Sequence, residues 1–228
     1  SAVNDAMNMS TVFHQLGFDQ VHLLTNKQVT KDNIFETLSI IGGDTDPKDL
    51  LVLYFAGHGV STNTKAGLQT GYLIPFGCGQ GEELEEGVPM DLLAETIRKM
   101  RNSHVLSLLD CCYSGQLLLE YKRSTQKSNV DLDYLKDFVK DRCRFVLTAT
   151  SGTGMAQESI KNGLFTQCVL DVLAGTTKHH HKGYVSVNDD LAPYVSRKTK
   201  ERSRGSQKPK SGLLEEGDGE IAITYKKL

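Results

Sequence analysis

Two residue types that together support nucleophilic catalysis, a histidine and a cysteine, each follow a short apolar stretch of this chain. His58 comes shortly after Leu50–Phe55 (LLVLYF), and Cys111 and Cys112 come shortly after His104–Leu109 (HVLSLL). An imidazole can take the proton of a thiol and later protonate a leaving amine, while the thiolate attacks an amide carbonyl. The pattern therefore favours a cysteine nucleophile assisted by His58.

Glycines stand on both sides of His58, and a glycine lets the backbone approach a substrate closely. We expect the amide N–H groups of Gly59 and of the nucleophilic cysteine to bind the oxyanion that forms when the thiolate attacks. A core thiol and an unrelated surface histidine are the simpler interpretation. The position of both residues directly after apolar stretches favours catalysis over that alternative.

The elements that must position these residues alternate between helix and strand. A helix is predicted over Asn4–Leu16, a strand over Val21–Leu24, and a helix from Thr30 to Ile41 that ends at Gly42-Gly43. Such alternation predicts an α/β fold with a mostly parallel central sheet and helices on both faces, whose chemistry lies at the carboxyl ends of the strands. Further predictions are strands at Tyr72–Pro75, Arg144–Thr150 and Glu220–Tyr225, helices at Met90–Met100, Leu132–Val139 and Leu164–Ala174, a helix opening at Ser186, a loop at Ser61–Thr70 and a mobile tail at Lys198–Lys210.

Composition and length limit the class of protein. The 228 residues fit a single domain, and 39% hydrophobic with 24% charged residues is ordinary for a soluble globular chain. A net charge of −2 gives no reason to expect nucleic acid or an anionic membrane as a partner. No apolar run approaches the roughly 20 residues of a membrane span. Five cysteines, an odd number without a C-x-x-C pair, predict reduced thiols in a cytoplasmic protein.

Three other features are compatible with metal or thiol chemistry but have simpler explanations. The acidic, glycine-rich stretch 77–87 is predicted to be a solvated loop, with a calcium site as the alternative. His179–His181 is predicted to lie in an exposed loop, because consecutive side chains point in different directions and no second ligand group is near in sequence. Cys168 lies on the apolar face of a predicted helix and is expected in the core. No metal site is predicted.

The two reactive stretches resemble known motifs. Tyr54–Gly59 (YFAGHG) and Asp110–Gly115 (DCCYSG) are similar to the histidine and cysteine motifs of metacaspases and bacterial caspase-like peptidases, family C14. The histidine precedes the cysteine by about 50 residues, as in caspases. Gly71–Pro75 and Gly217–Glu220 also fit, so the resemblance spans almost the whole chain. It implies a caspase-like domain over residues 1–228 with a sheet of about six strands, whose first strand is expected before Ser1.

The resemblance also implies roles for individual residues. Cys112 matches the nucleophile, which leaves Cys111 to face the core, and His58 matches the base. Gly59 and Cys112 match the oxyanion hole, and Asp5 and Asp110 match an acidic pocket for the residue before the cut. Two carboxylates favour a guanidinium or ammonium group, so cleavage of proteins or peptides after Arg or Lys, through a thioester, is implied. For Asp5 alone, an acid that complements a helix dipole is the alternative.

Departures from the family pattern affect regulation. Ala56 stands where a serine often precedes Gly-His, and Tyr113 replaces a frequent histidine. Leu119 stands near the position of a calcium-binding aspartate of some metacaspases, so neither calcium nor another cofactor is predicted. With basic specificity, Lys122-Arg123 is a candidate self-cleavage site, the alternative being a solvated basic loop.

The resemblance further implies a zymogen held silent by a regulatory or sensor partner or fused domain, with a role in defence or cell death by analogy. A catalytically silent caspase-like domain that binds partners is the alternative function. A thiol phosphatase is excluded, because residue 118 is leucine where its Cys-x5-Arg loop needs arginine.

Overall fold

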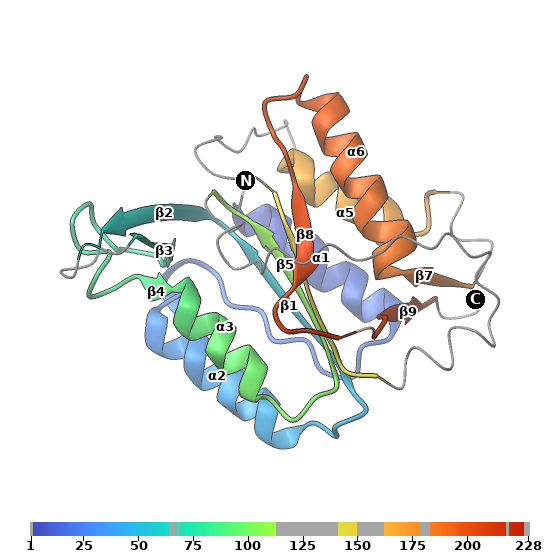
Figure 1. Ribbon diagram of the computed structural model, residues 1–228, viewed down its shortest axis with the longest axis horizontal. Coiled ribbons are helices and arrows are strands. Elements are labelled where there is room, and N and C mark those ends of the chain that lie inside the picture. The colour runs from blue at the N-terminus through green and yellow to red at the C-terminus, as the bar shows by residue number, and fades with distance from the viewer. Residues whose placement is uncertain are drawn as a thin grey trace.

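A four-stranded sheet forms the centre of the protein, in the order β1-β5-β6-β8 (Figure 1). The computed structural model describes residues 2–63, 67, 69–112, 141–149, 162–177, 183–217 and 219–225. The strands are β1 (Leu50–Ala56), β5 (His104–Asp110), β6 (Cys143–Thr148) and β8 (Lys210–Leu213). The first three are parallel, and β8 is antiparallel to β6. The predicted α/β fold with a mostly parallel sheet is therefore confirmed.

The number of strands in the sheet differs from the prediction of about six. Within the described residues the central sheet has four strands, because Val21–Leu24 forms no ladder and β9 (Ala222–Thr224) pairs elsewhere. The partner of β9 is β7 (Tyr184–Ser186), with which it forms a separate antiparallel pair. The predicted strand at Val21–Leu24 is thus wrong as a secondary-structure assignment, although the segment has an apolar composition.

Helices cover both faces of the sheet (Figure 1). Residues of α1 (Ala2–Leu16), α5 (Leu164–Leu173) and α6 (Ala192–Arg202) share one hydrophobic cluster with one set of strand side chains. Residues of α2 (Lys31–Asp44) and α3 (Met90–Lys99) share a second cluster with the other set. The two clusters form the core of an α/β/α sandwich.

Strand β5 separates the two clusters and carries the cysteine motif at its end. All seven of its residues are buried. Leu106 and Leu108 point to the α1 side, while Val105 and Leu109 point to the α2 side. Both faces are covered, which explains the nearly continuous apolar run in the sequence.

A β-arm extends from the carboxyl edge of the sheet (Figure 1). Strand β2 (His58–Asn63) pairs antiparallel with β3 (Gln69–Ile74), which pairs with the short β4 (Val88–Pro89). The prediction of a loop from Ser61 is wrong up to Asn63 and again from Gln69. The pairing with β3 supplies the backbone hydrogen bonds, so strand formation there needs no apolar side chains.

Three further predictions about helices and loops can be compared with the structure. Helix α2 continues through Gly42-Gly43 to Asp44, because neither glycine adopts the left-handed conformation that ends a helix. Lys198–Lys210 is no tail: its first part belongs to α6, where Val195 and Thr199 are buried. The Ser186 hydroxyl accepts a hydrogen bond from the Asp189 amide and opens a π-helical turn, Val187–Leu191, that leads into α6. Residues 132–139 lie outside the described residues.

Candidate active site

The histidine motif lies where β1 ends and the β-arm begins. Strand β1 stops at Ala56, and the Gly57 amide donates a hydrogen bond to the Asp110 carbonyl at 3.2 Å. This bond joins the ends of the two neighbouring parallel strands. His58 is the first residue of β2, and its side chain is exposed. The chain thus delivers His58 to the carboxyl edge of the sheet beside the end of β5.

The cysteine motif packs directly against the residue that follows His58. A Cβ atom placed on Gly59 would overlap the Cys112 carbonyl oxygen and would lie 3.4 Å from Cys111 Sγ. Only glycine allows this close approach of β2 to the cysteine backbone. The structure therefore brings the two predicted motifs together, with Gly59 against the backbone of Cys112.

The two adjacent cysteines differ in environment. Cys111 is fully buried and belongs to the hydrophobic cluster on the α2 side of the sheet. Cys112 is only partly buried. The expectation that Cys111 faces the core is confirmed, and so is the expectation that Cys168 is a core thiol. Of the adjacent pair, only Cys112 is partly exposed.

The two predicted pocket acids meet at the amino end of α5. Asp5, in the first turn of α1, accepts hydrogen bonds from the Gly163 amide at 3.1 and 3.3 Å. A Cβ atom on Gly163 would lie 2.7 Å from Asp110 Oδ2 and 3.5 Å from Asp5 Oδ2. The carboxylates therefore flank one point, and they are only 2% and 7% exposed. The positive end of the helix dipole favours the charge of both.

Asp110 is held by a chain of buried hydroxyl groups. The Thr166 hydroxyl donates to Asp110 Oδ2 at 2.6 Å, and the Thr166 amide donates to the same oxygen at 3.3 Å. Tyr54 Oη lies 2.6 Å from Thr166 Oγ1. Because a threonine hydroxyl has a single proton, Tyr54 is the donor in this contact. Burial, aided by the charge of Asp110, raises the pKa of Tyr54, so the phenol keeps the proton that it donates.

Amide side chains join the first two turns of α1 to the start of α5. Asn162 Oδ1 accepts hydrogen bonds from Asn4 Nδ2 at 3.1 Å and from Asn8 Nδ2 at 2.8 Å. Asn162 Nδ2 donates to Gln167 Oε1 at 3.0 Å. This bridge keeps Asp5 at the amino end of α5.

Sequence reasoning did not identify Tyr54, Thr166 or the Asn162 bridge as parts of the site. Tyr54 belongs to the motif YFAGHG, and its polar tip on an otherwise apolar strand was an available signal. Thr166 and Asn162 carry no such signal, since their partners are remote in the sequence.

Some of the predictions concern residues that lie outside the described part of the chain. These residues are Tyr113, Leu119, Lys122, Arg123 and His179–His181. Within the parts of the chain that the structure describes, no group of three or more His, Cys, Asp or Glu side chains could hold a metal ion. No helix among these residues is long and apolar enough to cross a membrane.

A parallel α/β sheet with a histidine and a cysteine on adjoining strand ends is the arrangement of a caspase-like domain. The sequence pattern of the caspase domain family, peptidase C14, matches residues 1–212, and the chain belongs to this family. It is distantly related to metacaspases. It is 26% identical to Metacaspase-1 of Scheffersomyces stipitis over 72% of this chain, and 29% identical to Metacaspase-1A of Aspergillus clavatus over 54%.

The chain covers only 46% and 32% of those two relatives. A crystal structure of a protein from Geobacter sulfurreducens matches the fold with a TM-score of 0.64 at 16% identity. The match covers 92% of this chain and 83% of that one. This likeness supports the fold alone.

Proposed function

We propose that this domain is a cysteine endopeptidase that cleaves proteins or peptides after Arg or Lys. The observation that carries the proposal is the meeting of two buried carboxylates, Asp5 and Asp110, at the strand end that also bears Cys112. A guanidinium or ammonium group satisfies such a pair by charge-assisted hydrogen bonds, whereas an acidic side chain would be repelled. The metacaspase resemblance points to the same specificity.

The proposed covalent chemistry uses His58, Cys112 and Gly59. His58 takes the proton of Cys112, and the thiolate attacks the backbone carbonyl carbon of the bound Arg or Lys. The C–N bond of the tetrahedral intermediate breaks, the new amine leaves with the proton from His58, and a thioester remains. Water, deprotonated by His58, then hydrolyses the thioester and restores the thiol. The amides of Gly59 and Cys112 bind the oxyanion in both halves of the reaction.

Fluorogenic peptides that end in Arg, Lys, Asp or Ala test this proposal. The wild-type domain is expected to cleave the Arg and Lys peptides only, and Cys112→Ala is expected to abolish the reaction. Cys78→Ala is the matched control, since Cys78 is a partly exposed thiol on the segment after β3. Equal cleavage by Cys112→Ala would disprove the assignment of the nucleophile. No turnover of any peptide would favour the catalytically silent, partner-binding domain.

Regulation by self-cleavage at Lys122-Arg123 is a further part of the proposal. The site has the basic residues that the acid pair would bind, and the sequence there is polar. Mass spectrometry of purified wild type and Cys112→Ala distinguishes the outcomes. A cut in the wild type alone supports maturation by the enzyme itself, and identical fragments in both exclude it. A sensor partner or fused domain that keeps the enzyme silent is proposed on the same family resemblance.

A further inference from the structure

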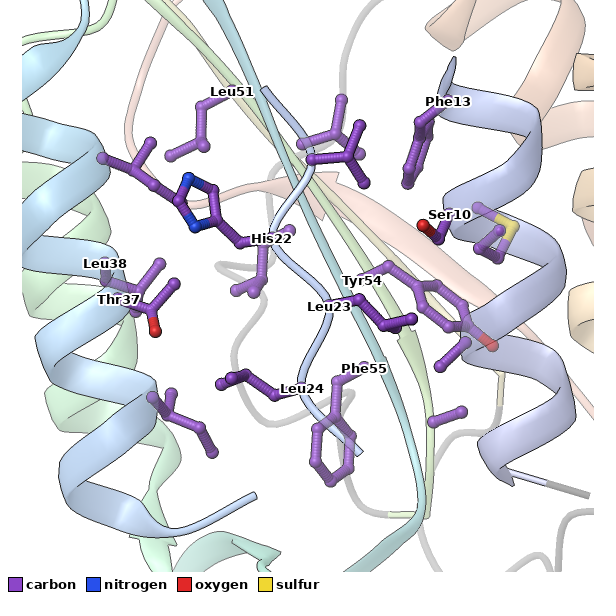
Figure 2. A pocket seen from close by; sticks show the side chains of 18 of the residues that line it. Ser10, Phe13, His22, Leu23, Leu24, Thr37, Leu38, Leu51, Tyr54 and Phe55 are labelled. Atoms are coloured by element: carbon purple, nitrogen blue, oxygen red, sulfur yellow. The ribbon is translucent and has the colours of Figure 1, made fainter. Parts of the chain in front are cut away.

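The two sides of the candidate active site differ in character. On the outer side of β1 lies an apolar pocket of about 880 Å³, between α1 and α2 (Figure 2). Its lining includes Phe13, Leu38 and Leu51. On the other side, beyond β6, the chain carries a concentration of positive charge. Seven of the 26 lysine and arginine residues stand within residues 197–210, beside a single acid, although the whole chain has a net charge of −2.

Three of these basic side chains remain unpaired where α6 leads into β8. Arg202, at the end of α6, is paired with Asp171 at 2.9 Å. In contrast, Arg204, Lys208 and Lys210 are exposed and form no ion pair with another described residue. We call these three residues the basic turn. Their charges are available to an anionic group of a ligand.

The basic turn has a hydrogen-bonded backbone. Arg204 adopts the left-handed conformation with a φ of 53°, which is uncommon for a residue other than glycine. The Arg204 amide donates a hydrogen bond to the Glu201 carbonyl at 3.1 Å, and the Gln207 amide donates to the Ser203 hydroxyl at 3.0 Å. The Gln207 side chain is fully buried and anchors the turn. The charges therefore start from a fixed backbone, which lowers the entropy cost of binding a ligand.

The register of the sheet places the basic turn at the edge that carries the cysteine motif. Lys210 pairs with Thr148 of β6, and Thr148 pairs with Leu109 of β5, three residues before Cys112. Because β8 runs antiparallel to β6, the residues that precede Lys210 lie toward and beyond the carboxyl edge. Two strand spacings, roughly 10 Å, separate β5 from β8. An extended peptide covers that distance with about three residues.

The position of His58 decides which part of a peptide substrate would face the basic turn. His58 follows β1, which lies on the opposite side of β5 from β8. In the proposed reaction His58 protonates the leaving amine, so the residues after the cut would lie on the β1 side. The residues before the cut would then extend from Cys112 across β6 toward β8. Counting the cleaved Arg or Lys as the first, the third or fourth residue would reach the basic turn.

The negative charge at the same edge favours a peptide over a nucleic acid as the ligand. Asp5 and Asp110 are buried there, and the loop between β3 and β4, which starts next to His58, carries four glutamates. A long polyanion that followed this edge would meet both groups and be repelled. A short acidic stretch followed by one basic residue complements the basic turn and the acid pair together.

We propose that the basic turn selects substrates with acidic residues at the third and fourth positions before the cut. The selection rests on the proposed peptidase function, because the roles of His58 and Cys112 define the path of the peptide. The favoured sequence is two acidic residues, any residue and then Arg or Lys. The contact joins exposed charges, so it strengthens binding of the peptide and weakens as salt screens the charges.

Two fluorogenic peptides, Asp-Asp-Gly-Arg and Asn-Asn-Gly-Arg, test this selection. The wild-type domain is expected to cleave the Asp peptide with a KM about three- to tenfold lower at low salt, because each exposed ion pair contributes little by itself. The difference in KM between the peptides should shrink when NaCl is raised to about 0.5 M, since salt screens exposed charges.

The double variant Arg204→Asn/Lys208→Gln should lose the preference for the Asp peptide. Asparagine tolerates the left-handed backbone at position 204, so the charge is removed without added strain. The matched control is Lys48→Gln/Arg101→Asn, which removes an exposed lysine and an exposed arginine just before β1 and β5, at the opposite edge of the sheet. Both double variants have the same net charge, and the control should keep the preference.

Fluorescence anisotropy of the same peptides, labelled with fluorescein and bound to Cys112→Ala, gives a readout without turnover. Tighter binding of the Asp peptide that depends on Arg204 and Lys208 would support the selection even if no peptide were cleaved, and the peptidase proposal alone would then fail. Equal KM and equal binding of the two peptides, or a preference that survives in the double variant, would overturn the selection. A short oligothymidylate that bound more tightly than the Asp peptide would also overturn it, because the basic turn would then bind nucleic acid.

Discussion

The acid pair and the proposed catalytic dyad lie at the same edge of the sheet but are held in different ways. Asp5 and Asp110 are buried and bonded to the first turn of α5. His58 is exposed and Cys112 is partly exposed, and the contact that joins their motifs is a backbone one at Gly59. The pocket acids are thus part of the core, whereas the reactive groups lie on its rim. Substitutions in the two regions should therefore separate stability from turnover.

The largest loss of activity with the smallest loss of stability is expected for His58→Ala. Without its general base the enzyme should lose about 10²–10⁴ in kcat/KM. Because the imidazole is exposed, the free energy of unfolding should change by no more than about 0.5 kcal/mol. Peptide cleavage and urea unfolding measure the two quantities. A marked destabilisation would show that His58 is a structural residue and would remove the contrast.

Asp110→Asn should damage both properties at once. The amide keeps the shape but loses the charge that attracts a basic side chain. Cleavage after Arg should therefore fall by about 10²–10³ in kcat/KM, which corresponds to the loss of about one or two charge-assisted hydrogen bonds. The same change weakens the bonds to Thr166 and should cost about 1–3 kcal/mol of stability. Asp19→Asn, an exposed acid beyond α1, is the matched control and should alter neither. An Asp110→Asn protein of wild-type stability would show that the bonds between Asp110 and Thr166 do not stabilise the core.

Gly59→Ala tests the contact between the two motifs. The added methyl group overlaps the Cys112 carbonyl, so β2 must shift away from the cysteine backbone. We expect a loss of about 10–100-fold in kcat, with a cost of about 1–3 kcal/mol from overpacking. Gly43→Ala is the control, because a Cβ there meets no atom within 4 Å and the position is helical. If both alanine variants kept wild-type kcat, the close approach would have no role in catalysis.

The smallest effect is expected for Thr166→Val, which removes the hydroxyl between Tyr54 and Asp110. Asp110 keeps its charge and the Thr166 amide donor but loses the 2.6 Å hydrogen bond from the Thr166 hydroxyl. KM for Arg peptides should rise about tenfold, the equivalent of one hydrogen bond, with kcat nearly unchanged. Thr166→Ser should restore KM, since it returns the hydroxyl. A fall in kcat at constant KM would show that the hydroxyl chain acts on the dyad instead of the pocket.

Much of the scaffold was predictable because each element is encoded locally. The apolar runs of β1 and β5 mark parallel strands covered on both faces, and α1 and α3 follow from helical spacing. The predictions failed where pairing with another segment decides whether a strand forms. Polar residues up to Asn63 form a strand because β3 pairs with them, whereas apolar Val21–Leu24 pairs with no strand among the described residues.

By itself, the sequence determined which residues could react and on which strand ends they lie: His58 after β1, Asp110 at the end of β5 and Cys112 just beyond it. These follow from apolar runs and from motifs that are contiguous in the chain. Only the tertiary structure decided that Gly59 touches Cys112 and that Asp5, Asp110 and Thr166 meet at the start of α5. Those contacts join residues more than 50 positions apart. The packing of helices and strands determines these contacts, and no local sequence pattern predicts them.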